Sequence, residues 1–247
     1  MKFEDLSRVR VEDLRVILWD IDGTLVRSSR TGAFKLYTAP VLEKVFGTSG
    51  RLKELTVSGM TDLQIVAEAL RDEGHTHATI RERAQELRTT YMQEMERVTA
   101  TGEDLFYALP GAREILQATE AHPRYLNALL TGNIEPAAKL KLRLIGLLDF
   151  FQLPGAFGDD SHDRRELPAI AAARINQRTG FNFQPAQFIV VGDTPNDIDC
   201  ARHFGAHVVA VATNRSYSVD DLSQHNPNAV LLDLTDTALV IKTFDQL

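Results

Sequence analysis

Five short apolar runs, separated by helical patterns, constrain the fold of this chain more than any other feature. They lie at 15–20, 125–130, 187–191, 207–212 and 229–232. Continuous apolar runs of this length are typical of strands buried on both faces of a parallel sheet. Apolar residues with helical spacing lie between the runs, at 111–121, 135–147, 167–179 and 196–204. Strands that alternate with helices form right-handed βαβ units, so the sequence predicts an α/β fold with a mostly parallel sheet and helices on both faces.

The segment between the first two runs has a different pattern. From 26 to 106 it contains glycine punctuation, helical spacing at 33–46, 62–71 and 79–98, and no convincing strand. A helical block inserted after the first strand predicts a cap domain at 26–106 that lies outside the sheet. The catalytic core is then expected to consist of 1–25 and 107–247.

Composition excludes several classes of partner. The chain has 247 residues with a formal net charge of -7 and no basic tract, so we expect no nucleic-acid partner. No apolar run approaches the roughly 20 residues that cross a bilayer, and the first ten residues have no apolar signal region. Cys200 is the single cysteine, which fits a reducing compartment. We therefore expect a cytoplasmic protein without membrane contact, either a monomer or a homodimer.

The first apolar run ends in two carboxylates. The motif Asp20-Ile-Asp22-Gly23-Thr24 stands where open α/β sheets bind ligands, at the carboxyl end of a strand. Residues two apart in an extended chain point to the same side, so Asp20 and Asp22 can face one pocket. Gly23 then allows a sharp turn. The alternative interpretation is an acidic turn that caps a helix.

A second acidic cluster follows the run at 187–191, in Gly192-Asp193-Thr-Pro-Asn-Asp197. If the two strand ends meet, their carboxylates repel one another, and not all of them can stay ionised without a counter-ion. A hard divalent cation resolves this conflict, and Mg²⁺ suits a sparse carboxylate site that also binds phosphate. The alternative for Asp193 and Asp197 is turn and N-cap chemistry.

These motifs resemble those of the haloacid dehalogenase superfamily, and within it the phosphoglycolate phosphatase group with a helical cap. The resemblance covers nearly the whole chain and implies a Rossmann-like core. The second motif is 129–133, which ends in Thr131-Gly132-Asn133. In the third motif relatives carry a lysine, whereas this chain has Arg164 and Arg165. Spacing to Pro168 favours Arg165, and similarity to sequences with Asp-Arg-x-x-Leu-Pro favours Arg164, so both remain candidates.

The resemblance implies a phosphatase that hydrolyses a small-molecule phosphate ester through an aspartyl-phosphate. Asp20 would be the nucleophile and Asp22 the general acid and base. Mg²⁺ would be held by the Asp20 carboxylate, the Asp22 carbonyl and the Asp193 carboxylate, with support from Asp197. Thr131 and the arginine would hold the phosphoryl group. The expected substrate-binding residues are Gly23, Thr24, Gly132 and Asn133 in the core, and Arg27, Gly59, Thr61 and Asp62 in the inserted segment.

Some of these assignments have simpler alternatives. Thr61 or Asp62 can cap the helix that follows, and Arg27 can be a solvated loop residue. The acid at Asp22 favours phosphate esters, because the superfamily's dehalogenases and phosphonate hydrolases lack it. Two other functions stay open: a phosphomutase of the β-phosphoglucomutase type, and a catalytically idle binding module, which the intact acidic motifs disfavour.

Overall fold

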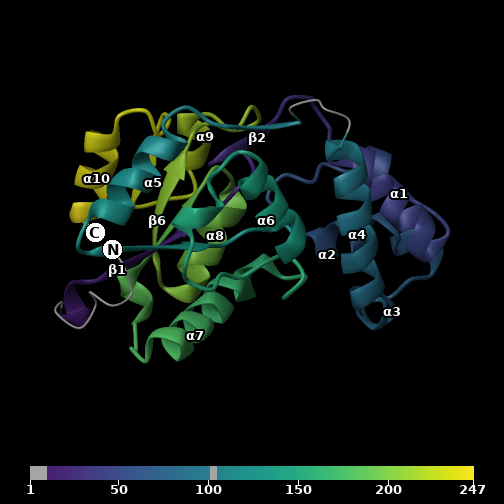
Figure 1. Cartoon of the computed structure of the whole chain (residues 1–247), viewed down its shortest axis with the longest axis horizontal. Helices are drawn as coiled ribbons and strands as arrows, with labels where there is room; N and C mark the ends of the chain where they lie inside the picture. Colours follow the sequence, from purple (N-terminus) through teal and green to yellow (C-terminus); the bar gives the residue numbers. More distant parts are fainter. Residues whose placement is uncertain (1–9, 101–104) are drawn as a thin grey trace.

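Figure 1 shows the computed structural model, which describes residues 10–100 and 105–247. The first ten residues, where no signal region is expected, lie outside the described residues except for Arg10. Within the described residues, no helix has the length and apolar character needed to cross a membrane.

The core is a five-stranded parallel sheet with the strand order β4-β1-β5-β6-β7. Its strands are β1 (Arg15–Trp19), β4 (Tyr125–Leu129), β5 (Phe188–Gly192), β6 (His207–Val211) and β7 (Ala229–Leu231). Each lies within one residue of the predicted run at both ends. Because Trp19 pairs with Leu129 on one side and Val191 on the other, the carboxyl ends of three strands adjoin. The predicted α/β fold is confirmed.

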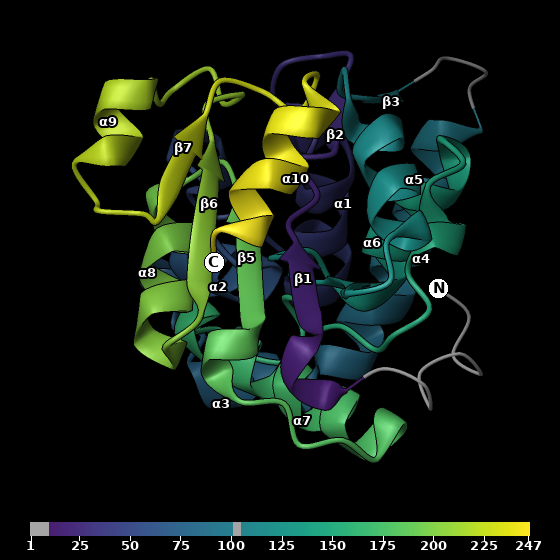
Figure 2. The same ribbon diagram turned by 90° about the vertical axis from the view of Figure 1, so that its left-hand side faces the viewer.

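Helices lie on either side of the sheet (Figure 2), and alternate side chains of the strands belong to two different apolar clusters. Ile17 and Trp19 belong to one apolar cluster, whereas Val16 and Leu18 belong to the other. The first cluster includes α5 (Ala112–Ala121), α6 (Glu135–Leu144) and α10 (Thr237–Asp245), and the second includes α7 (Leu167–Thr179), α8 (Pro195–Phe204) and α9 (Val219–Ser223). Burial on both faces explains why the strands are apolar without alternation.

The inserted helices form a separate group at one end of the sheet, visible at the right of Figure 1. They are α1 (Lys35–Phe46), α2 (Asp62–Ala69), α3 (His77–Glu82) and α4 (Ala84–Thr99). Short 3-10 turns complete the described structure: η2 (Val11–Asp13), η3 (Leu52–Glu54), η4 (Arg71–Glu73), η5 (Leu148–Phe150), η6 (Arg164–Glu166) and η7 (Pro185–Gln187). The fold therefore has the predicted helical insertion as well as the sheet.

Two details of the insertion differ from the prediction. The segment from 26 begins with a strand, β2 (Val26–Ser28), which pairs antiparallel with β3 (Phe106–Ala108). This pair has only three residues in each strand and was therefore not apparent as a period-two pattern. The helix expected at 79–98 is two helices, with a break at Arg83, where φ is -100° and ψ is 11°.

Candidate active site

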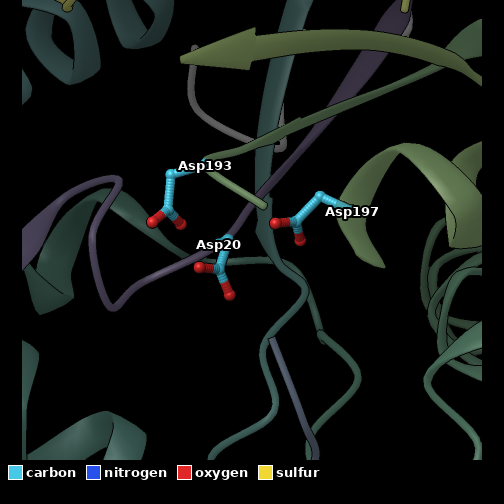
Figure 3. A group of neighbouring side chains, drawn as sticks. All are labelled: Asp20, Asp193 and Asp197. Atoms are coloured by element: carbon cyan, nitrogen blue, oxygen red, sulfur yellow. The ribbon is translucent and has the colours of Figure 1, made fainter. Parts of the chain in front are cut away.

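Three buried carboxylates converge at the carboxyl ends of β1 and β5. Asp20 is 5% exposed, and both Asp193 and Asp197 are fully buried. Ligand oxygens of the three lie within 4.8 Å of one another (Figure 3). The Asp20 backbone N–H donates to the Val191 carbonyl at 2.9 Å, which continues the sheet hydrogen bonding and fixes the two strand ends together. The structure thus brings together the two acidic motifs.

The turn after Asp20 packs directly against Asp193. Gly23 has a φ of +93°, and a Cβ atom there would lie 2.1 Å from Asp193 Oδ2. The Thr24 hydroxyl donates to Asp193 Oδ1 at 3.2 Å, and Asn214 Nδ2 donates to Oδ2 at 2.6 Å. Thr24 is fully buried and does not line the cavity, so its expected role in substrate binding is not supported by its position.

Asp197 has two sets of partners. Its Oδ2 accepts from the Thr194 backbone N–H at 3.0 Å and the Thr194 hydroxyl at 2.7 Å, which forms a capping box at the start of α8. Its Oδ1 accepts from Arg164 at 2.5 Å. Asp197 therefore helps to cap α8 as the N3 residue, with Thr194 as the N-cap, and the same carboxylate also faces the acidic cluster.

Of the two candidate arginines, the structure brings Arg164 to the site. Its side chain is buried, and Nη2 donates to Asp20 Oδ1 at 2.9 Å as well as to Asp197. The Arg165 side chain is 52% exposed and pairs with Asp163 at 2.7 Å. Arg165 does not reach the carboxylates, because η6 turns adjacent residues to different sides. Arg165 is therefore not the third-motif residue of this site, and of the two candidates Arg164 is.

The electrostatics of the cluster favour a bound cation. Burial raises the pKa of Asp20 to about 7, although the charge of Arg164 opposes the rise. Burial also raises the pKa of Asp193 well above its usual range, and the charges of Asp20 and Asp197 raise it further. Arg164 is shared by two of the three carboxylates, so the cluster has excess negative charge when all three are ionised. Hard oxygen donors in this number fit Mg²⁺, which commonly binds through one or two carboxylates and retains waters.

The second motif follows β4 and lies beside the Asp22 side chain. Asn133 Nδ2 donates to Asp22 Oδ2 at 2.6 Å and to the Thr131 hydroxyl at 2.8 Å. The Gly132 carbonyl accepts from the Asp62 backbone N–H at 2.7 Å. Thr131, Gly132 and Asn133 all line the cavity, as does Asp22. The first and second motifs therefore share one wall.

Sequence reasoning missed Lys141, which lies in α6 and is 3% exposed. Its ammonium donates to Asp22 Oδ2 at 2.7 Å and to Asn133 Oδ1 at 2.6 Å. A signal for it was available, because Ala137 and Ala138 precede it by four and three residues and therefore share its helix face. A lysine on the buried apolar face of a helix needs a buried partner.

The loop before α2 carries the predicted cap residues. Asp62 Oδ2 accepts from the Ile134 backbone N–H at 2.8 Å, and burial raises the pKa of Asp62 to about 6. Thr61 is fully buried and accepts from the Gln64 N–H at 3.1 Å as the N-cap of α2. Gly59 and Asp62 line the cavity, whereas Thr61 does not. The simpler interpretation therefore holds for Thr61.

These residues enclose a cavity of about 320 Å³. Asp20, Asp22 and Arg164 line it, and the inserted segment contributes Tyr37, Met60 and Ile65 to the lining. Three arginines also line it: Arg27, Arg30 and Arg215. Arg30 and Arg215 are exposed, which places them at the solvent side, while Arg27 donates to the Thr213 carbonyl.

Comparisons with known proteins place the chain in a family. The family model described as haloacid dehalogenase-like hydrolase matches residues 14–205. A phosphoglycolate phosphatase from Nitrosospira multiformis is 34% identical over 104 residues, which are 42% of this chain and 44% of that protein. The chain thus matches less than half of this curated relative's length.

Solved structures show the same fold at low identity. A phosphoglycolate phosphatase, described as predicted, from Haemophilus somnus superposes with a TM-score of 0.63 at 20% identity, covering 93% of this chain and 98% of that one. A β-phosphoglucomutase from Clostridium difficile superposes with a TM-score of 0.64 at 16% identity, covering 94% and 98%. The family match spans most of the chain, including every strand end that carries a carboxylate of the cluster, and on that ground this chain belongs to the haloacid dehalogenase-like hydrolases.

Proposed function

We propose that this protein is a Mg²⁺-dependent phosphatase that hydrolyses small phosphate monoesters through an aspartyl-phosphate on Asp20. One observation carries the proposal. The buried Asp20 carboxylate, the cavity-facing Asp22 carboxylate and the Arg164 guanidinium line the same cavity. A nucleophile, an acid and a fixed cation are the groups that phosphoryl transfer through a covalent intermediate needs.

The reaction has two steps. In the first, an Asp20 oxygen forms a bond to phosphorus while the bond from phosphorus to the ester oxygen breaks, and Asp22 gives its proton to the departing oxygen. In the second, Asp22 takes a proton from water as the water oxygen attacks the phosphorus and frees Asp20. The same carboxyl thus serves as acid and then as base.

Asp20, Asp193 and the Asp22 carbonyl would hold Mg²⁺, with Asp197 in support. When bound, the ion neutralises phosphoryl charge and fixes the geometry of the in-line attack. The clustering of the three carboxylates supports this assignment.

Arg164 and Thr131 are the proposed phosphoryl-binding groups. Within the described ranges, 10–100 and 105–247, the buried Arg164 Nε has no hydrogen-bond acceptor. A buried donor without a partner costs free energy, and a phosphoryl oxygen would satisfy it. Thr131 is fully buried and lines the same cavity.

The cavity also points to a substrate class. Its lining includes the Asp20 carboxylate, apolar side chains of the inserted segment, and Arg27, Arg30 and Arg215. We therefore propose an ester whose leaving group carries a second anionic group, which Arg27 and its neighbours would contact. Residues 26–106 would form the cap that excludes water and selects this group. We place the enzyme in the cytoplasm.

The first experiment measures phosphate release from a panel of phosphomonoesters, with and without a second anionic group, in Mg²⁺ and in EDTA. We expect turnover by the wild type in Mg²⁺ only, higher kcat/KM for the esters with a second anion, and loss of turnover in Asp20→Asn. Asp233→Asn, at a partly exposed carboxylate that does not line the cavity, is the matched control and should retain activity.

Two results would contradict the proposal. Full activity in EDTA would show that the reaction does not depend on Mg²⁺. If folded protein in Mg²⁺ released phosphate from none of the esters, the protein would not be a simple phosphatase. In the second case, conversion of one sugar phosphate into another would identify the mutase alternative.

A further inference from the structure

Lys141 is a buried cation that the proposed reaction does not use. It lines the cavity, yet its side chain is only 3% exposed. Its ammonium donates to Asp22 Oδ1 at 2.9 Å, to Asp22 Oδ2 at 2.7 Å and to Asn133 Oδ1 at 2.6 Å. A lysine ammonium has three donors, and these three acceptors surround it.

The same ammonium lies next to two elements at the base of the insertion. Its Nζ atom is 5.4 Å from the centre of the Phe106 ring in β3, within the range of a cation–π contact. Its charge also acts on the Tyr37 hydroxyl of α1, whose pKa burial raises to about 12 while Lys141 opposes the rise. Burial lowers the pKa of Lys141 itself, but the charge of Asp22 more than offsets this, so the group remains an ammonium.

The burial of this ion pair is unequal. The Lys141 side chain is 3% exposed, whereas the Asp22 side chain is 43% exposed and faces the cavity. A carboxylate this exposed is already solvated and gains little stability from a partner. Burying an ammonium, by contrast, costs free energy because it loses its hydration. Stability alone therefore does not explain why the chain places a lysine here.

Orientation does explain it. Both Asp22 oxygens accept from Lys141, and Oδ2 also accepts from Asn133, so rotation of the carboxyl is restricted. Proton transfer in the transition state requires the acid to lie within hydrogen-bond reach of the departing oxygen. A carboxyl on a half-exposed side chain without these contacts would sample several rotamers.

We propose that Lys141 is a positioning residue for the general acid and base Asp22, anchored by Asn133 and by contact with the base of the insertion. The inference rests on the proposed phosphatase function and adds a residue that holds the proton donor in line. In the step it assists, Asp22 is protonated on one oxygen while the other still accepts from Lys141, and that proton moves to the ester oxygen as the bond from that oxygen to phosphorus breaks and the bond to Asp20 forms. Lys141 itself transfers no proton.

The test compares esters that differ in how much they need the acid. Nitrophenolate leaves without protonation, whereas an alkoxide does not. For Lys141→Met we expect kcat/KM to fall roughly 100-fold on alkyl phosphates and less than about threefold on p-nitrophenyl phosphate, the range that a positioned acid contributes. Asp22→Asn should give the same pattern, and the double variant should be little worse than Asp22→Asn alone, because residues that act as a unit are non-additive.

Lys139→Met is the matched control, since Lys139 lies in the same helix, is 46% exposed and pairs with Glu135. Lys139→Met should leave kcat/KM unchanged for every ester. If Lys141→Met melts far below the wild type, Lys141→Gln, which keeps a donor for Asn133 but no charge, replaces it in the same assay.

Three outcomes overturn the inference. An equal loss on alkyl and nitrophenyl esters would make Lys141 a structural or phosphoryl-binding group. A loss that adds fully to that of Asp22→Asn would show that the two act independently. Wild-type protein that turns over no ester would instead remove the proposed function, and this inference with it.

Discussion

Gly23 allows the first-motif turn to pass directly over the Asp193 carboxylate. An added Cβ would lie 2.1 Å from Asp193 Oδ2, and the backbone φ of +93° already disfavours a side chain. We expect Gly23→Ala to displace Asp193, lower phosphatase activity by roughly tenfold or more, and destabilise the fold by about 1–3 kcal/mol. Activity assays and thermal melts on the purified variant check both effects.

Gly180→Ala separates backbone strain from the clash in this experiment. Gly180 has a φ of +74° at the end of α7, but an added Cβ would meet nothing within 4 Å. It should lose stability and keep activity. Equal activity in the two variants would show that the close approach of Gly23 to Asp193 is not needed for the reaction.

A site residue could be predicted where the residue and the pattern that positions it lie in the same motif. Asp20 and Asp193 follow apolar runs, so their meeting follows from the parallel sheet. The choice between Arg164 and Arg165 could not be made this way, because it depends on how η6 is rotated against α8. Lys141 was missed since its partner Asp22 lies 119 residues away in the chain.

At the scale of elements, α2 contacts the core through the start of α6. The Asp62 carboxylate accepts from the Ile134 N–H, and its backbone N–H donates to the Gly132 carbonyl. Burial raises the pKa of Asp62 to about 6 from 3.8. Below pH 3.8 the carboxyl is protonated in both states, so it contributes no pH dependence there. Above pH 6 it is ionised in both states, and the native state bears the full desolvation penalty.

We therefore expect Asp62→Asn to be more stable than the wild type above pH 6, by on the order of 1–2 kcal/mol, and to lose this advantage near pH 4. The asparagine Oδ1 can still accept from Ile134. Thermal melts at several pH values test this. Asp233→Asn should trend oppositely, because Thr235 lowers the pKa of Asp233. A constant difference between Asp62→Asn and the wild type at all pH values would contradict the prediction.

Elements with strong local patterns were predicted well, and those without were not. The five strands of the parallel sheet lie in apolar runs of four to six residues, which a sheet buried on both faces requires. By contrast, β2 and β3 are three-residue strands that exist only because they pair with each other across the whole insertion. No glycine or proline marks the break between α3 and α4 at Arg83, so no local signal predicted it.

At the scale of the whole molecule, one apolar cluster joins the sheet to the inserted helices. It runs from Trp19 in β1 through Ile21, Leu25 and Val26 to Leu42 in α1, all buried. A continuous core of this kind favours cooperative unfolding of both parts. Trp19 in β1 is the only tryptophan of the chain, and it is fully buried and contacts Phe244 of α10. Its fluorescence therefore reports the unfolding of the core alone.

We expect Leu42→Ala, a change in the insertion, to lower the melting midpoint seen by Trp19. Truncating a fully buried leucine costs about 2–5 kcal/mol. For a chain of this size that shifts the midpoint by roughly 5–15 °C. Because unfolding is cooperative, fluorescence and far-UV ellipticity should shift equally. Leu36→Ala, in the same helix but at a position 43% exposed, should shift neither by more than about 2 °C. If ellipticity shifts while the Trp19 midpoint stays in place, the inserted helices unfold independently and the shared core does not couple them to the sheet.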